Sequence, residues 1–240
     1  NRGAFPDAND FLPAVIAVAR KHPELQFAIR LHPNLDTKVA GTNHGEVDDA
    51  LAVCRDAPDN VRVILPREDI SSYVLFDIAA AGCVYASTIG LEMAATGKPV
   101  VVCARSTYAH TGCADWVQAP ERFEAAIVEA VRRGPDKERT RKALRWAYHY
   151  FWMLSQPFPL VAEEPQHAAK LGYQGLGQLA PGRDRALDRI ARVMLGQEPL
   201  FPPPTPAEAA RTVAAEEAYF DEVLAGRFPR GAVGSAAAVG

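Results

Sequence analysis

Short apolar runs alternate with amphipathic helical patterns over roughly the first 130 residues, and this alternation constrains the fold more than any other feature. The runs are apolar throughout, as expected for strands covered on both faces, and the helical crossovers between them imply parallel pairing. We therefore predict an α/β fold, a Rossmann-like parallel sheet with helices on both faces. The expected strands cover residues 25–31, 60–65, 83–85 and 99–103.

The helical patterns and the proline breaks divide the chain into a large N-terminal part and shorter C-terminal segments. The expected helices cover residues 8–21, 47–55, 70–78, 120–133, 136–154 and 183–195, and WAYHYFW at 146–152 is expected to pack in the core. The predicted organisation is a Rossmann-like domain (1–160), a helical extension (161–199), a proline-rich linker (200–206), a C-terminal helix (207–226) and a disordered tail (227–240). Because the chain begins with Asn1 rather than a methionine, we expect it to be a piece of a longer protein.

Charge and cysteine content exclude several classes of protein. A net charge of −3 and a pI near 6.1 provide no electrostatic footprint for binding nucleic acid. No apolar run approaches the roughly 18 residues of a membrane-spanning helix. The four cysteines lack CxxC spacing, so we expect reduced thiols and a cytoplasmic protein, with peripheral association at the inner face of the membrane left open.

Common catalytic motifs are missing. The sequence contains no GxGxxG, no GxxxxGK[ST] and no GxSxG, which argues against dehydrogenases, P-loop enzymes and α/β-hydrolases. Its six histidines lie far apart, without HExxH or HxH spacing. We therefore expect neither a metal site nor a cofactor.

Polar residues follow the predicted strands at three successive turns, where an open parallel sheet binds its ligands. The first group is RLHPN at 30–34, in which His32 follows a strand and Pro33 fixes the turn. His32 either donates a hydrogen bond to a phosphate oxygen or is satisfied by a neighbouring carbonyl. Arg30 is a weaker candidate in the same segment.

The second group is PREDISSY at 66–73. Ser71 and Ser72 are placed to cap the next helix, which is the interpretation we favour. A nucleobase resting against backbone groups near Arg67 and Glu68 is the weaker alternative.

The third group opens the stretch STIGLEMAATGKPVVV, which begins at residue 87. Ser87 and Thr88 stand between a strand and a helix, so free backbone N–H groups and the positive end of the helix dipole face the predicted crevice. Gly90 removes a side chain where a phosphate would approach. Glu92 lies one turn inside the helix, too far along for a capping box, and ribose hydroxyls are its natural partners. The alternative is an ordinary serine cap with a surface glutamate.

A fourth set of polar residues follows the strand at 99–103. Arg105, Ser106, Tyr108 and His110 lie in the loop that leaves this strand. They either line a pocket or form an ordinary polar loop, and we keep Arg105 and Tyr108 as weaker candidates for substrate binding.

Three segments in this order carry a family resemblance. RLHPN, then STIGLEMAATGKPVVV about fifty residues later, then the Tyr108–Gly112 loop resemble the C-terminal, nucleotide-binding half of GT-B glycosyltransferases. They are most similar to capsular polysaccharide biosynthesis proteins that transfer Kdo from CMP-Kdo, and to bacterial sialyltransferases with His-Pro and Ser/Thr motifs. The resemblance covers roughly residues 1–160.

The resemblance implies a metal-independent transfer from a nucleotide-activated donor, such as CMP-Kdo, to a glycan or glycolipid acceptor in surface polysaccharide assembly. By this likeness His32 contacts the donor phosphate, Ser87 and Thr88 hold that phosphate at the helix start, and Glu92 binds the ribose. The general base of such enzymes usually comes from an N-terminal, acceptor-binding half. We find no such half in this sequence, so we assign no catalytic residue and expect an acceptor domain as a partner.

Two other functions remain open. One is a non-catalytic module that binds a nucleotide-sugar or acts as a scaffold. The other is an enzyme that resembles CDP-alcohol phosphotransferases, for which the same features would serve.

Overall fold

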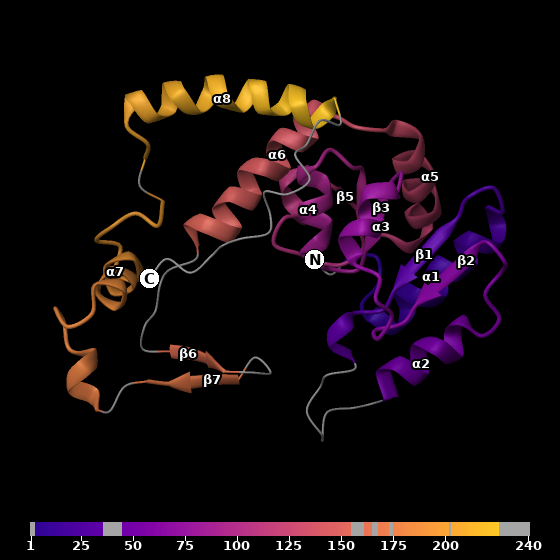
Figure 1. Cartoon of the computed structure of the whole chain (residues 1–240), viewed down its shortest axis with the longest axis horizontal. Coiled ribbons are helices and arrows are strands. Elements are labelled where there is room, and N and C mark those ends of the chain that lie inside the picture. Colours follow the sequence, from indigo (N-terminus) through magenta and orange to yellow (C-terminus); the bar gives the residue numbers. More distant parts are fainter. Residues whose placement is uncertain are drawn as a thin grey trace.

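The computed structural model describes residues 3–35, 45–154, 161–164, 168–172, 175–201 and 203–225, and Figure 1 shows how its elements are arranged. Its strands are β1 (Phe27–Arg30), β2 (Val61–Ile64), β3 (Gly82–Val84), β4 (Val100–Val102), β5 (Asp115–Trp116), β6 (Val161–Glu164) and β7 (Ala168–Leu171). Its α-helices are α1 (Ala8–Lys21), α2 (Gly45–Cys54), α3 (Ser72–Ile78), α4 (Ile89–Ala95), α5 (Phe123–Arg133), α6 (Lys137–Tyr148), α7 (Arg185–Met194) and α8 (Pro206–Leu224). Helices and strands alternate from α1 to β4, as the sequence predicts.

The strands from β1 to β5 pair only in parallel. β1 pairs with β2, while β3, β4 and β5 form a second sheet in that order. The predicted α/β, Rossmann-like fold is therefore confirmed, with the strands divided between two small sheets flanked by helices. The sequence analysis missed β5, because a strand of two residues is too short to carry an apolar pattern.

β4 lies at the centre of the core because its side chains alternate between two layers. Val100 and Val102 face a cluster built with α4 and α6, and Val101 and Cys103 face a cluster built with α1 and α5. All four are at most 1% exposed. Burying an aliphatic side chain of this kind contributes about 1.5–3 kcal/mol, so β4 joins the helices of both faces into one core.

The junction between α1 and β1 is organised by the buried amide of Asn60. Its Nδ2 lies 3.0, 2.9 and 2.8 Å from the carbonyl oxygens of Ala19, His22 and Leu25. The backbone carbonyl of Asn60 accepts the first hydrogen bond of β1, from Phe27 N over 2.8 Å. The side chain of this residue therefore satisfies carbonyl groups at the end of α1, and its backbone sets where β1 begins.

The aromatic cluster at the end of α6 is split between core and surface. α6 continues into a π-helical turn, η4 (His149–Met153). Trp146 and Tyr150 pack against the core cluster, whereas Tyr148 and Trp152 are 56% and 67% exposed. The segment therefore packs on the core through one face, as expected of a core helix, and Tyr148 and Trp152 lie on its exposed face.

The C-terminal segments differ in part from the predicted organisation. β6 and β7 form an antiparallel hairpin in the region where we expected a helical extension, and α7 follows it. Hairpin and α7 lie away from the parallel sheets in Figure 1. α8 (Pro206–Leu224) spans the region of the predicted C-terminal helix at 207–226, and the predicted tail at 227–240 lies outside the described residues.

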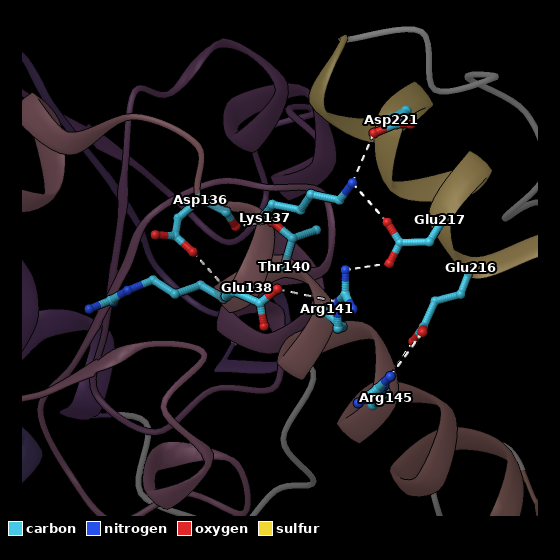
Figure 2. A network of polar contacts seen from close by, with 10 residues as sticks. Asp136, Lys137, Glu138, Thr140, Arg141, Arg145, Glu216, Glu217 and Asp221 are labelled. Carbon is cyan, nitrogen blue, oxygen red and sulfur yellow. Dashed lines mark hydrogen bonds and ion pairs between the residues drawn. The ribbon is translucent and has the colours of Figure 1, made fainter. Parts of the chain in front are cut away.

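The C-terminal part of α8 packs against α6, and several ion pairs join the two helices (Figures 1 and 2). Lys137 Nζ lies 2.9 Å from a Glu217 carboxylate oxygen and 3.1 Å from one of Asp221. Phe220 is fully buried beneath these pairs, and the Arg141 guanidinium carbon lies 4.9 Å from the centre of its ring. A basic face of α6 and an acidic face of α8 thus enclose one apolar anchor.

Two further properties concern the cysteines and the length of the helices. Cys54, Cys83, Cys103 and Cys113 are all unpaired thiols. Within the described ranges, no helix combines the length and the apolar content that crossing a bilayer requires.

Candidate functional site

The first predicted site residue lies where β1 ends. His32 is exposed and precedes a short 3-10 turn, Pro33–Leu35, that ends the strand. The Arg30 guanidinium makes hydrogen bonds within the protein, because it donates to the carbonyl oxygens of Leu31 and Leu65. Arg30 thereby ties the end of β1 to the end of β2, and its role in binding stays a prediction.

The loop after β2 is held by its own polar groups. Glu68 accepts hydrogen bonds from the Leu65 backbone N–H over 2.7 Å and from Arg62 over 2.8 Å. These contacts, the backbone bond first, hold the pKa of Glu68 below its usual value. Ser71 caps α3 by accepting from Tyr73 N over 3.2 Å, as predicted, and Ser72 is the first residue of that helix.

The turn after β3 presents the two predicted hydroxyls to solvent. Ser87 and Thr88 are both exposed, and Thr88 makes no side-chain capping bond. The Ser87 hydroxyl accepts a long bond from Ile89 N, at 3.4 Å, while the Gly90 N–H donates to the Ser87 carbonyl oxygen over 3.2 Å. Some backbone groups of the turn are therefore already hydrogen-bonded within it, and both hydroxyls remain accessible to a ligand.

Gly90 has a packing role that the sequence analysis did not identify. A Cβ atom at this position would lie 2.2 Å from the Tyr108 hydroxyl oxygen and 2.8 Å from Cγ2 of Val84. Close approach of these side chains explains the glycine, since the space next to its Cα is already filled. A phosphate beside Gly90 stays a prediction.

Glu92 connects two helices. Its carboxylate accepts a hydrogen bond from the Tyr73 hydroxyl over 2.8 Å, which joins α4 to α3. This bond is the main reason why the pKa of Tyr73 is raised. Glu92 is half-buried on its helix, so one of its oxygens is fixed by the tyrosine and the predicted contact with ribose stays untested.

Tyr108 is a buried support rather than a wall of the site. It is fully buried, and its hydroxyl donates to the Ser87 carbonyl oxygen over 2.7 Å. Burial raises the pKa of this phenol well above its usual value, so the hydroxyl stays protonated and remains a donor. The weak prediction that Tyr108 contacts substrate therefore gives way to a structural role, in which it positions the Ser87 turn.

A pocket of about 300 Å³ lies just beyond the carboxyl ends of β4 and β5. Its lining residues come from the loop after β4 and from β5 itself, and they are Arg105, Ser106, Ala109, His110 and Trp116. The loop residues Arg105, Ser106 and His110 were expected either to line a pocket or to form an ordinary loop, and the pocket is what the structure shows. Trp116 was missed, because the only signal was a tryptophan two residues after the apolar Cys-Ala pair.

The charges beside this pocket are balanced by fixed ion pairs. Asp115, which precedes Trp116, accepts from Arg133 over 2.7 Å and from Arg139 over 2.9 Å. The Asp115 carboxylate is the main reason why the pKa of Arg133 is raised. Its negative charge is thus compensated by two guanidinium groups from α5 and α6, which also clamp β5 to those helices.

The carboxylates at the strand ends share one property. Glu68, Glu92 and Asp115 each accept a hydrogen bond from a specific protein donor. Across the part of the chain that the structure describes, no cluster of three His, Cys, Asp or Glu side chains is arranged to hold a metal ion.

Comparison with known proteins places these elements in a family. Residues 1–143 match a family model described as "Capsule polysaccharide biosynthesis protein". The matched range contains every predicted site residue, all five parallel strands and the pocket. The comparisons with curated proteins and with solved structures gave no match.

Proposed function

The chain belongs to the capsule polysaccharide biosynthesis family, and we propose that it is the donor-binding half of a metal-independent GT-B glycosyltransferase. Its donor is a nucleotide-activated sugar, and a CMP-linked sugar such as CMP-Kdo fits the resemblance of its motifs. The single observation that carries this proposal is the family match over residues 1–143, which spans the parallel α/β core and its strand ends. That core is the architecture in which ligands bind at carboxyl strand ends.

The donor phosphate is proposed to bind between two turns. His32, exposed after β1, donates a hydrogen bond to a phosphate oxygen, and the exposed hydroxyls of Ser87 and Thr88 donate to the same group. As the glycosidic bond breaks, negative charge grows on the leaving phosphate, and these donors stabilise it where it develops. Glu92 binds the ribose with the carboxylate oxygen that Tyr73 leaves available.

Catalysis is proposed to need a group from outside this chain. Glu68 accepts from a backbone N–H and from Arg62, and the resulting lowered pKa makes it a poor base. Both carboxylate oxygens of Asp115 already accept from the guanidinium groups of Arg133 and Arg139. Glu92 is assigned to the ribose. The base that activates the acceptor hydroxyl is accordingly assigned to an acceptor-binding domain that completes the enzyme.

Calorimetry with CMP, CDP, UDP and GDP tests the proposed donor. We expect cytidine nucleotides to bind best, and the isolated chain to transfer no sugar to a simple acceptor. His32→Ala should weaken the binding of CMP by about 1–3 kcal/mol, the scale of a lost hydrogen bond to a charged group. It should weaken the binding of cytidine less, because cytidine lacks the phosphate. His22→Gln is the matched control, because His22 lies before β1, at the end of the strand away from the proposed site.

Three results would contradict the proposal. Equal affinity for all four nucleotides removes the cytidine assignment. An unchanged dissociation constant in His32→Ala returns that histidine to the ordinary loop interpretation. Efficient sugar transfer by this chain alone removes the need for a second domain.

A further inference from the structure

We propose that the pocket lined by Arg105, Ser106, Ala109, His110 and Trp116 binds the carboxylate of an acidic sugar. This inference deepens the proposed function, on which it rests for the idea that the sugar is the donor's. It assigns to this chain the recognition of the sugar's charge, separately from the recognition of the nucleotide.

The polar lining of the pocket is made almost entirely of donors. Arg105 and Trp116 can only donate hydrogen bonds, and the hydroxyl of Ser106 can rotate to donate as well. No carboxylate is among the five lining residues. A ligand group that offers only acceptors satisfies such a lining. Among the acceptor-only groups that sugars carry, a carboxylate also brings the negative charge that Arg105 favours.

One of these donors is buried without a partner. Trp116 Nε1 is shielded from solvent and has no hydrogen-bond partner among the described residues. A buried donor left unsatisfied costs about 1–3 kcal/mol, which is why native structures rarely contain them without a reason. A bound acceptor in the pocket removes this cost, and the indole N–H is the group that points most directly to a ligand.

The local charge also favours an anion. Arg105 lines the pocket, while Asp115, the residue before Trp116, is already compensated by Arg133 and Arg139. The loop that forms the pocket also passes close to a second cation, since a Cβ on Gly112 would lie 3.3 Å from Lys142 Nζ. A negative group entering the pocket therefore meets Arg105 in a lining that contains no acidic residue.

The pocket is placed to act together with the proposed phosphate site. Tyr108 belongs to the loop that lines the pocket, and its hydroxyl bonds the carbonyl of Ser87, which stands in the proposed phosphate turn. A volume of about 300 Å³ suits a group of monosaccharide size and lies at the small end of ligand pockets. Nucleotide and sugar of one donor can thus occupy neighbouring strand ends.

The test compares three free ligands on the whole chain by NMR or calorimetry: glucuronate, glucose and inorganic phosphate. Glucuronate and glucose share a pyranose ring and differ in the carboxylate. We expect glucuronate to bind in the millimolar range, glucose at least about ten-fold more weakly, and phosphate more weakly than glucuronate at this pocket. Equal binding of the two sugars, or a preference for phosphate, overturns the inference.

The variants locate the binding. Trp116→Phe keeps an aromatic ring and removes the N–H, and Arg105→Gln removes the charge of an exposed side chain. Each should weaken glucuronate about five- to ten-fold, because each removes one donor to a charged group. Trp152→Phe is the matched control, since Trp152 is 67% exposed on η4 and lies outside the pocket lining. If Trp116→Phe loses its fold by circular dichroism, Arg105→Gln still decides, and an unchanged affinity in the folded variants rejects the pocket.

A parallel titration with CMP separates this inference from the proposed function. If Trp116→Phe loses affinity for glucuronate but not for CMP, and His32→Ala loses affinity for CMP but not for glucuronate, both the pocket and the proposed function stand. If CMP does not bind at all but glucuronate still depends on Trp116, the nucleotide assignment fails and the pocket stands. If CMP binds and depends on His32 while no variant affects glucuronate, the pocket fails and the proposed function stands.

Discussion

The Tyr108 hydroxyl donates a hydrogen bond to the Ser87 carbonyl oxygen over 2.7 Å and so joins the loop after β4 to the turn after β3. Both partners belong to turns at carboxyl strand ends, and Tyr108 is completely buried between them. Any movement of the Ser87 turn is therefore transmitted to the loop that lines the pocket. The two proposed subsites share one support.

Removing this hydroxyl should loosen both turns. Tyr108→Phe keeps the ring in place but removes one of the two donors to the Ser87 carbonyl oxygen, so that only the Gly90 N–H remains. We expect this loss to cost about 0.5–1.5 kcal/mol of folding free energy. Urea denaturation measures the loss. Tyr148→Phe serves as the control, because Tyr148 is 56% exposed and a surface change of this kind stays within about 0.5 kcal/mol. A loss no larger than in the control would mean that the bond does not hold the turn.

Adding one methyl group to Gly90 should disturb the same support. Gly90→Ala places a Cβ 2.2 Å from the Tyr108 hydroxyl, and such overpacking costs about 1–3 kcal/mol. Gly175→Ala is the matched control, because Gly175 has an extended backbone and nothing within 4 Å of its Cβ position. Thermal unfolding of the double variant Gly90→Ala, Tyr108→Phe gives a sharper result. Its loss of stability should be smaller than the sum of the losses in the two single variants, because the second change removes the hydroxyl that the new methyl group meets. A loss equal to that sum would argue against the clash.

Glu92→Gln tests the ribose contact. If the carboxylate binds ribose hydroxyls, the variant should weaken CMP by about 1–3 kcal/mol and weaken the matching 2′-deoxynucleotide less, since that ligand already lacks one partner. Tyr73→Phe is the companion variant, because it removes the hydrogen bond that orients Glu92 without removing the charge. Equal shifts for both nucleotides in Glu92→Gln would refute the ribose role and leave the phosphate site untouched.

The attachment of α8 should depend on pH in one direction. Hydrogen bonding to Lys137 is the main reason why the pKa of Glu217 lies below the ordinary value of 4.5. A lowered carboxylate pKa stabilises the folded form above the unfolded value, and this stabilisation is lost as pH falls through the folded value. The difference in thermal midpoint between the wild type and Glu217→Gln should therefore shrink as pH falls below about 4.5, and it should shrink at high salt.

The exposed Glu222 on the same helix provides the control for this experiment. Glu222→Gln should change the midpoint less than Glu217→Gln at neutral pH. A difference between wild type and Glu217→Gln that persists unchanged at low pH would show that packing of Phe220, and not charge, holds α8 in place.

The elements that the sequence predicted well are those whose pattern is local. The apolar run at 99–103 became β4 because every residue in it is buried on one side of the sheet or the other, and α1 has the bounds that its amphipathic pattern indicates. β5 and the β6–β7 hairpin were not predicted. A strand of two residues is too short to show an alternating pattern, and the pairing of β6 with β7 depends on two segments at once. Their positions depend on partners that a one-dimensional pattern does not record.

The candidate site shows the same limit. His32 and the pair Ser87 and Thr88 were predicted because each follows an apolar run, and the structure leaves all three exposed after the ends of strands. Their contact with a ligand stays a prediction. Gly90 was interpreted as space for a ligand, although its neighbour in space is Tyr108, eighteen positions later in the chain. The indole of Trp116 became a candidate only when the loop before it was seen to fold over a cavity.

α6 carries a consequence for where this protein can be divided. The family match ends at residue 143, in the middle of this helix, yet Ala147 beyond that point is buried in the same core cluster as Ala143. Trp146 and Tyr150 pack there as well. The cooperative folding unit therefore runs past the limit of the family match and includes η4. A fragment that stops at residue 143 would expose the part of the core that these later residues cover, and would tend to aggregate.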